Sequence, residues 1–492
     1  MAGGVAALAA CTSAPPEAAG SAGRSGSTAT IGGPDGSPAP AGDSPAGSGE
    51  ARRRAVVVGA GLAGLTAALD LRDAGWEVVV LEARDRLGGR VRTLRAPFAE
   101  GVRVEAGGEL VDGDHRALRA LLERFGVGLE RRSGAGEEVV SLGGELTTRA
   151  ALRARRGGAV GREVDAVAAA LTALGDGLDP EHPERFGRAA ELDAQSLDDL
   201  LARHQLSPEA DFLVRSDVRS EYAAEPGDLS LLFLAQQAQV GGDEDQAETH
   251  RIAGGSEALL AAVGGELDGV VRLSSPVSEV VRGPSGIEVA TTNDRITAAQ
   301  LVLALPVPPL RRIRFEPPLP GAAARMVAEL GMGSVTKVIT EHDGHPWRRA
   351  GHSGETASDQ PYGTSWDPTD SSDAPRGLLT RYVAGAEARR AAALDEAGRI
   401  RRYATQVDEV LPEVAGTATG AAVAVSWDVE PETGGAYAAP APGQVVPFWP
   451  VLRSPIGPIR FAGEHTEALA GYMESAVRSG HRVAREIGPP PG

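Results

Sequence analysis

The chain has 492 residues, 42% of them hydrophobic and 24% charged, and its formal charge is −18. This length exceeds what a single hydrophobic core organises, so we expect about two folded domains of ordinary globular composition. The negative charge disfavours nucleic acid as a partner, because phosphate binding requires a basic face, and no apolar run reaches the length of a transmembrane helix.

The first 51 residues are predicted to be a lipoprotein signal followed by a tether. The only cysteine, Cys11, ends the string VAALAAC, which resembles the site at which bacterial lipoproteins are cleaved and lipidated. Residues 12–50 are almost wholly Ala, Gly, Ser, Pro and Thr, so they lack the apolar side chains that offset the entropy of folding. We therefore expect an extracytoplasmic bacterial protein with a lipid anchor at Cys11. Because the apolar stretch is short and no basic region precedes it, the alternatives are a start further upstream or a chance match in a cytoplasmic protein.

A strand, a glycine-rich turn, a helix and a second strand are predicted over residues 55–81. The strands are the apolar runs 55–58 and 77–81, and the helix covers residues 62–74. The turn carries the pattern G-x-G-x-x-G, which lets the backbone approach a pyrophosphate at the helix N-terminus. Glu82 ends the second strand, where a carboxylate accepts hydrogen bonds from a ribose diol. The turn residues assigned to dinucleotide binding are Gly59, Gly61, Leu62, Ala63 and Gly64.

The segment that begins at Glu82 distinguishes FAD from NAD. Residues 82–90 read EARDRLGGR and resemble a segment of the flavin-containing amine oxidases, a family that includes monoamine, polyamine and L-amino-acid oxidases. The resemblance implies that Glu82 binds the adenosine ribose of FAD. It also implies that the following residues lie along the cofactor, namely Ala83, Arg84, Gly89 and Arg90.

Two segments further along the chain also resemble this family. Gly107 and Gly108 resemble the loop beside the flavin, and Val277 lies where the family's backbone approaches adenine. Glu109 follows the glycine pair and is either a determinant of substrate choice or a structural carboxylate.

Composition and periodicity predict that strands and helices are mixed along the rest of the chain. We expect strands over residues 277–281, 287–291, 301–305, 335–340 and 459–462, and helices over residues 116–125, 164–174 and 386–409.

Lys337 is the only lysine among the 49 Lys and Arg residues. It lies in the string GSVTKV, which resembles the family's strand whose lysine reaches flavin N5 through a water. In a site of low dielectric a lysine can shift its pKa and assist proton movement or oxygen activation, whereas an arginine does not easily lose its proton. The resemblance therefore implies a catalytic role for Lys337. The alternative interpretation is that this single lysine codon persisted by chance and has no catalytic role.

The C-terminal region carries a second cofactor motif. Residues 459–466 read IRFAGEHT and resemble the strand and turn that meet the ribityl chain, so Gly463 and Glu464 are assigned to FAD. Met473 is expected near the start of a helix that continues to about residue 487. The positive end of that helix suits negative charge that develops on a reduced flavin.

Tyr437 and Tyr472 resemble the two aromatic side chains that flank the amine in front of the flavin in monoamine oxidases. Tyr437 follows a glycine pair and lies ten positions after Trp427, an arrangement that is also typical of the family. Two ring faces guide a partly positive nitrogen and exclude water, although two ordinary buried tyrosines are the alternative. Ala436 stands where monoamine oxidases carry the cysteine that bonds to the flavin, so we expect noncovalent FAD.

The resemblance implies a mixed α/β fold. In it, a Rossmann-like FAD-binding domain of the two-dinucleotide-binding type is intertwined with a discontinuous substrate-binding domain. The FAD-binding parts are expected at residues 52–128, 250–327 and 428–490, and the substrate-binding parts at residues 129–249 and 328–427. The sequence specifies neither the particular amine nor an oligomeric state.

The activity implied by the resemblance is FAD-dependent amine oxidation. A hydride passes from the amine α carbon to flavin N5, the imine is hydrolysed, and O2 reoxidises the flavin to give H2O2. No metal centre is expected. An L-amino-acid oxidase is the nearest alternative, since it shares these motifs but requires a cation for the substrate carboxylate. A flavin-dependent desaturase and a non-catalytic flavin-binding surface protein are further alternatives.

Overall fold

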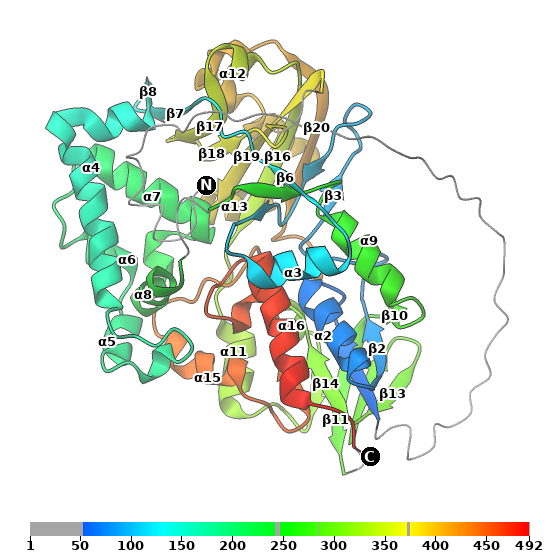
Figure 1. Cartoon of the computed structure of the whole chain (residues 1–492). Coiled ribbons are helices and arrows are strands. Elements are labelled where there is room, and N and C mark those ends of the chain that lie inside the picture. Colours follow the sequence, from blue (N-terminus) through cyan, green and yellow to red (C-terminus); the bar gives the residue numbers. More distant parts are fainter. Residues whose placement is uncertain (1–52, 242–246, 285, 371–373, 492) are drawn as a thin grey trace.

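The computed structural model describes residues 53–241, 247–284, 286–370 and 374–491. The predicted signal and tether, and with them Cys11, lie outside these residues. In the described ranges, no helix combines the length and apolar character that crossing a membrane requires. The larger groups of elements are a five-stranded sheet with its helices, a seven-stranded sheet, and a cluster of helices beside them (Figure 1).

The five-stranded sheet is parallel throughout, in the order β10-β2-β1-β14-β21. Its strands come from distant parts of the chain, namely β1 (Arg54–Val58), β2 (Glu77–Leu81), β10 (Val271–Arg272), β14 (Gln300–Leu303) and β21 (Ile459–Phe461). Side chains alternate along β1, so Ala55 and Val57 face one apolar core while Val56 and Val58 face another. This explains why the run is apolar at every position, as buried parallel strands usually are.

Helices cover both faces of this sheet. On one face, α2 (Leu62–Asp73) packs side by side with α16 (Met473–Ile487), and α3 (Arg116–Arg124) packs against α16 (Figure 1). The core on the other face includes residues of α10 (Val307–Leu310), α11 (Gly321–Glu329) and α15 (Val445–Arg453). A four-stranded sheet completes that core, with strands β11 (Val277–Gly283), β12 (Gly286–Thr291), β13 (Arg295–Ala298) and β15 (Arg314–Glu316).

The seven-stranded sheet has the order β20-β16-β19-β18-β17-β7-β8. Its strands are β7 (Glu137–Leu142), β8 (Glu145–Thr148), β16 (Val335–Asp343), β17 (His352–Ser358), β18 (Thr364–Trp366), β19 (Arg376–Ala384) and β20 (Ala418–Ser426). Strand β16 pairs with β19 on one side and β20 on the other, so that Lys337 stands opposite Tyr382 and Val425. A strand paired on both sides holds its side chains in fixed directions, which suits a residue that must meet another part of the chain.

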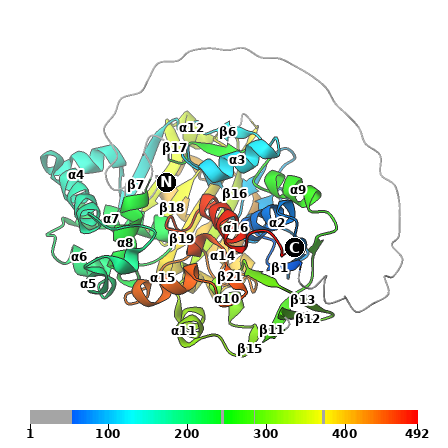
Figure 2. The same cartoon turned by 60° about the horizontal axis from the view of Figure 1, so that its bottom comes forward.

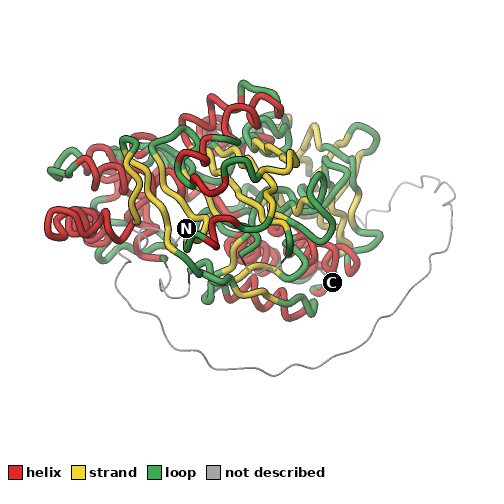
Figure 3. The backbone as a smooth tube through the Cα atoms, turned by 90° about the horizontal axis from the view of Figure 1, so that it is seen from above, coloured by secondary structure: helices red, strands yellow, loops and turns green. Residues whose placement is uncertain are grey.

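A cluster of helices occupies one end of the molecule, as Figures 2 and 3 show. Its members are α4 (Arg149–Leu174), α5 (Ala189–Asp193), α6 (Leu197–Leu201), α7 (Pro208–Tyr222) and α8 (Leu231–Val240). The Ser207 side chain caps the start of α7, and Pro208 occupies its first turn, where the missing N–H costs no hydrogen bond. At the other end, Ala223 has left-handed backbone angles that stop the helix. The last turn of α7 therefore ends at a fixed place, next to the main cavity of the protein.

The remaining elements are short connections and small sheets. They are β3 (Thr93–Leu94), β4 (Val104–Glu105), β5 (Leu110–Val111), β6 (Leu129–Arg131), β9 (His250–Ile252), α9 (Glu257–Glu266), α12 (Pro346–Arg349), α13 (Gly385–Ala392) and α14 (Glu396–Tyr403), with 3-10 turns at Pro183–Arg185, Pro226–Asp228, Gln406–Glu409, Pro412–Val414 and Glu464–Thr466. The predicted strands and the helices at 62–74 and 116–125 agree with the structure to within a few residues. The predicted helix at 164–174 is the last part of α4, which begins earlier and contains a break over residues 155–158.

Residues 386–409 are largely helical, as expected, but the helix is interrupted. The segment forms α13, α14 and a 3-10 turn. The Asp395 side chain accepts a hydrogen bond from the Gly398 amide and so caps a new helix in the middle of the segment. The boundaries proposed for the FAD-binding and substrate-binding segments stay predictions.

Candidate active site

A cavity of about 540 Å³ is lined by residues of both larger sheets, of α7 and of α16. Every residue that the sequence analysis assigned to cofactor or substrate lines this cavity, apart from Gly64. Motifs up to about 400 residues apart in the chain therefore meet at one site. This is required if one FAD molecule contacts motifs near both ends of the sequence.

The glycine-rich turn has no space for side chains. A Cβ atom at Gly59 would lie 2.6 Å from the Ala304 carbonyl oxygen, and one at Gly64 would lie 1.9 Å from the Gly59 carbonyl oxygen. Gly64 thus allows α2 to begin directly against the strand that precedes it, although it does not line the cavity. No side chain caps the first amides of α2, which follow Gly61. The turn therefore offers the close approach and the free donors that a pyrophosphate requires.

The Glu82 carboxylate lies at the rim of this turn, buried at the end of β2. Its oxygens accept hydrogen bonds from the Ala60 amide at 2.7 Å and the Arg84 amide at 2.9 Å. These bonds fix the direction of the carboxylate while leaving acceptor capacity for a ribose diol. The Arg84 guanidinium donates to Thr433 and lies 3.5 Å from Glu430.

The second cofactor motif is tied to the first by a buried ion pair. The Arg90 guanidinium lies 2.7 Å from the Glu464 carboxylate, which also accepts hydrogen bonds from the amides of Ala438 and Gly471. Burial alone would raise the pKa of Glu464, but the charge of Arg90 lowers it below its ordinary value. Tyr472, the N-cap residue of α16, makes no side-chain cap bond, so the first amides of that helix face the site without such a partner. Together these residues fit FAD.

Lys337 holds the loop of residues 105–109, beside the predicted flavin position, in place by hydrogen bonds. Its ammonium group donates to the carbonyl oxygens of Glu105 and Gly107, both at 3.0 Å, and to the Glu109 carboxylate at 3.1 Å. It also lies 5.0 Å from the centre of the Trp366 ring. An ammonium group has three N–H donors, so these three acceptors satisfy it. The assigned catalytic role of Lys337 stays a prediction, and the geometry adds a structural role to it.

Glu109 lies in the middle of the same network. Arg251 and the Trp366 indole each donate to one of its oxygens at 3.1 Å, and Lys337 donates to the other. Burial alone would raise the pKa of Glu109, but the charges of Lys337 and Arg251 lower it. Since both oxygens accept hydrogen bonds from protein groups, the arrangement favours a structural carboxylate over one that chooses the substrate.

Tyr437 and Tyr472 both line the cavity beside this network. The Tyr437 hydroxyl lies 2.5 Å from that of Tyr382, and the Tyr472 hydroxyl donates to Glu221 at 2.9 Å. The Tyr472 ring also packs edge to face on His115. Burial raises the pKa of both tyrosines well above the ordinary value, so the phenols are neutral. The structure thus brings the two predicted cage residues together and fixes each by a hydrogen bond.

Sequence reasoning missed several residues that line this cavity. They are Glu221, Glu248, Trp366 and Tyr382. None lies in a recognised motif. A signal existed for Tyr382 and Trp366, because the chain has only six tyrosines and five tryptophans, so each of them was a candidate.

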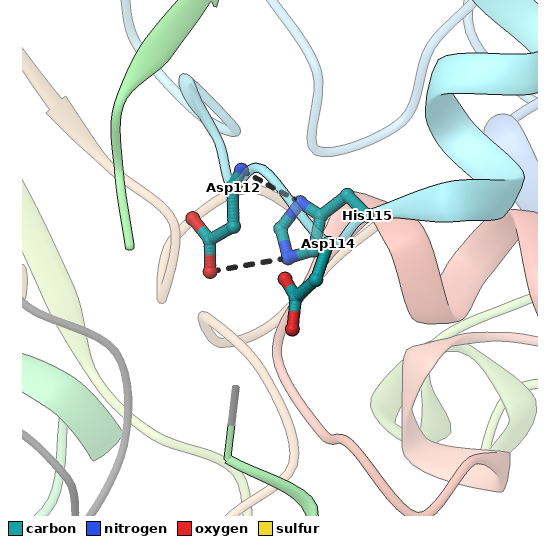
Figure 4. A group of neighbouring side chains, drawn as sticks. All are labelled: Asp112, Asp114 and His115. Carbon is teal, nitrogen blue, oxygen red and sulfur yellow. Dashed lines mark hydrogen bonds and ion pairs between the residues drawn. The ribbon is translucent and has the colours of Figure 1, made fainter. Parts of the chain in front are cut away.

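Asp112, Asp114 and His115 form a group with the residue types of a metal site (Figure 4). The Asp112 amide, however, donates to Nδ1 of His115 at 3.1 Å, so the proton of the neutral ring lies on Nε2. Nε2 faces the Asp112 carboxylate at 3.3 Å. Neither ring nitrogen then offers a lone pair to a metal, so the group fits a hydrogen-bonded support for the nearby Tyr472 ring.

Comparisons with known proteins agree with this site. The model of the flavin-containing amine oxidoreductases matches residues 62–488. A candidate flavin-containing monoamine oxidase of Mycobacterium tuberculosis is 29% identical over 453 residues, which cover 88% of this chain and 96% of that protein. An L-amino acid dehydrogenase of Synechocystis is 26% identical, with coverage of 88% and 94%. The solved structure of wild-type putrescine oxidase bound to putrescine is 28% identical and has a TM-score of 0.80, with coverage of 88% and 98%.

The family match begins within the glycine-rich turn and includes the second cofactor motif, and the solved relative has the same fold over almost its whole length. The expected cofactor and the mixed α/β architecture are therefore confirmed. The chain belongs to the flavin-containing amine oxidoreductase family and is an FAD-dependent oxidoreductase that acts on amines.

Proposed function

We propose that the chain is an oxidase of amines that carry no carboxylate. Tyr437 and Tyr472 would hold the neutral amine between their rings. FAD, when bound, supplies the hydride acceptor and passes the electrons to O2, which gives H2O2. Water hydrolyses the imine, so that amine, O2 and water yield carbonyl compound, ammonia and H2O2. The protein supplies orientation, a cage that excludes water, and electrostatics.

We propose amines rather than amino acids as substrates because of the charged residues that line the cavity. Among the described residues, the cations that line it are Arg84, Arg90, Arg312 and Lys337. Each of them already lies within 3.5 Å of a carboxylate of the protein. Near the two tyrosines, the charged lining residues are instead carboxylates, Glu221 and Glu248. A substrate carboxylate would meet repulsion there, whereas an L-amino-acid oxidase needs a cation.

A matched pair of substrates tests this choice. Butylamine and norvaline differ by the carboxylate on the α carbon. We expect butylamine to bleach the oxidised flavin of the anaerobic holoenzyme, norvaline to leave it yellow, and readmitted O2 to restore the colour with one H2O2 per turnover. Bleaching by amino acids alone would select the L-amino-acid oxidase, and bleaching by no member of an amine or amino-acid panel would refute the oxidase.

We also propose that Cys11 carries a lipid anchor, on the sequence evidence given above. The chain expressed in a bacterial host with labelled palmitate should incorporate label, and the variant Cys11→Ser should not. Equal labelling of the two proteins would refute the anchor.

A further inference from the structure

A second, smaller cavity shares a wall residue with the main one. Its volume is about 50 Å³, and Glu109 lines both cavities. A buried water needs roughly 10–15 Å³ of such a space and about two to four polar partners, so this cavity can hold a few waters. The polar side chains that line it are those of Arg103, Glu105, Glu109, Glu130, Arg251, Ser256 and Thr369.

The contact between Lys337 and Glu109 joins the two cavities. Lys337 lines the main cavity and donates to Oε2 of Glu109 at 3.1 Å. A carboxylate oxygen has two lone pairs, so Oε2 can also accept a hydrogen bond from a water in the second cavity. A buried lysine, unlike an arginine, can give up a proton. A proton can therefore move along this hydrogen bond while Lys337 keeps its other two, to the carbonyl oxygens of Glu105 and Gly107.

Glu105 supplies a carboxyl group inside the second cavity. It is 5% exposed, and its oxygens accept hydrogen bonds from the Thr93 hydroxyl and the Ser256 amide, both at 3.0 Å. Burial and the charge of Glu109 raise its pKa to about 7, although the hydrogen bonds and the charge of Lys337 act in the opposite direction. Near neutral pH this group therefore both takes up and releases a proton, as a proton carrier must.

Arg251 makes Glu109 a poor place for a proton to stay. Its guanidinium lies 3.1 Å from the Glu109 carboxylate, and it lines the second cavity. Burial alone would raise the pKa of Glu109, but the charges of Lys337 and Arg251 lower it. A proton that reaches Glu109 therefore passes on readily to water or to Glu105, whose pKa is higher.

Part of the lining of the second cavity reaches solvent. Arg103 and Glu130 both line it and form an ion pair at 2.5 Å, and their side chains are 35% and 36% exposed. The Glu109 side chain, by contrast, is 4% exposed. The lining of one cavity thus extends from a buried carboxylate at the active site to charged groups in contact with water.

The proposed reaction needs one proton to leave the active site and later to return. The substrate ammonium loses a proton before its carbon transfers a hydride, and the iminium that remains takes up water to give carbonyl compound and ammonium. H2O2 then forms from O2, the hydride and one proton, so the balance of protons over a turnover is zero. Because the proposed tyrosine cage excludes water from the reacting amine, this proton needs a path of its own.

We infer that the second cavity carries this proton between the active site and solvent, through Lys337, Glu109, bound water and Glu105. The inference deepens the proposed oxidase function and rests on it. Lys337 gives the proton to Glu109 in the reductive half of the reaction, and the same groups return it in the oxidative half. Only bonds to this proton form and break along the route.

Infrared spectra of the resting, FAD-loaded enzyme at about pH 6 test the route without turnover. Glu105 is protonated there, and the C=O band of its carboxyl group is identified by its loss in Glu105→Gln. Transfer into D2O should shift this band within the mixing time, because cavity water exchanges the proton with solvent. The absence of such a band, or a shift that takes minutes to hours, would overturn the route.

Stopped-flow absorbance with a pH-indicator dye tests the route during the reaction. When butylamine bleaches the flavin anaerobically, we expect one proton to appear in solution in step with bleaching. In Glu105→Gln the proton should appear about tenfold or more slowly. Val104→Ile adds one methylene group to a buried residue that lines the second cavity and keeps every carboxylate. It should delay the proton in the same way and slow the infrared exchange.

Glu341→Gln is the matched control. Glu341 is a buried carboxylate of β16 that lines neither cavity. It accepts hydrogen bonds from the Ala99 amide and the Thr419 hydroxyl, the same kinds of donor as at Glu105. The proton should appear in step with bleaching in this variant. Bleaching with an undelayed proton in both cavity variants would overturn the route and keep the oxidase, whereas failure of every amine to bleach the flavin would overturn both.

Discussion

The Lys337 ammonium lies 3.1 Å from the Glu109 carboxylate, and the two side chains are only 6% and 4% exposed. Removing Lys337 leaves the buried Glu109 carboxylate with Arg251 as its remaining cationic partner. We expect Lys337→Met to lower the free energy of unfolding by roughly 3 kcal/mol. Adding Glu109→Gln should restore part of the loss, because the buried carboxylate that lost one of its two cationic partners is then neutral. Urea unfolding of the two single variants and the double variant gives the interaction free energy, and strictly additive losses would contradict the pairing.

Lys337→Met should also slow chemistry while FAD stays bound. The loop that the lysine pins lies beside the predicted flavin position, so loss of its charge and its hydrogen bonds should reduce one half-reaction by about a hundredfold or more. Stopped-flow absorbance separates flavin reduction by amine from reoxidation by O2. Unchanged rates in both half-reactions would leave Lys337 with a structural role alone.

Tyr382→Phe tests the support of the amine cage. The variant loses the hydroxyl that lies 2.5 Å from that of Tyr437 and keeps the ring that packs on Trp366. We expect kcat/KM for amines to fall about threefold to tenfold with little change in bound FAD, because one neutral hydrogen bond contributes about 1 kcal/mol. Tyr403→Phe is the matched control, since the Tyr403 hydroxyl bonds to Glu387 and its ring does not line the cavity. Equal losses in both variants would argue against a specific role for Tyr382.

Glu82→Gln should weaken FAD binding. The carboxylate is already oriented by two backbone amides, so its remaining acceptor capacity is directed at the proposed ribose. Replacing a charged acceptor in a buried hydrogen bond should raise the Kd for FAD by about tenfold to hundredfold. Glu77→Gln, at the exposed start of β2, is the control. Titration of the apoprotein with FAD measures both constants, and equal affinities would exclude Glu82 from the cofactor site.

Glu105 should make stability depend on pH. Burial and the nearby charge of Glu109 raise its pKa from 4.5 to about 7, although hydrogen bonds and Lys337 act in the opposite direction. The folded chain therefore keeps a proton that the unfolded chain has lost, and this group reduces stability as the pH rises from about 4.5 to about 7. The reduction approaches about 3 kcal/mol.

Glu105→Gln keeps the size of the side chain and an acceptor for the Ser256 amide and the Thr93 hydroxyl. Relative to the original chain, the variant should gain stability between about pH 5 and about pH 7, and the difference should level off toward pH 8. Denaturant unfolding across this range checks the slope, and a constant difference between the two proteins would show that Glu105 does not titrate there.

The spacing of neighbouring residues in the sequence by itself determined several local features of the cofactor site. The turn from Gly59 to Gly64, the carboxylate of Glu82 and the strand that carries Lys337 are all predictable, because the steric and hydrogen-bonding demands act over a few neighbouring residues. The same local reasoning predicted helix over residues 386–409 but not its interruption, where the Asp395 side chain caps a new helix.

Only the tertiary structure decided which side chains meet at the cavity. Lys337 and Glu109 are 228 positions apart, and Tyr472 and Glu221 are 251 positions apart. Such pairs are set by how β16 and the end of α7 pack against loops from elsewhere in the chain, and no local pattern encodes that packing. Glu221 and Glu248 line the cavity because the end of α7 meets the turn before β9, and our proposal that the substrates are amines without a carboxylate depends on this meeting.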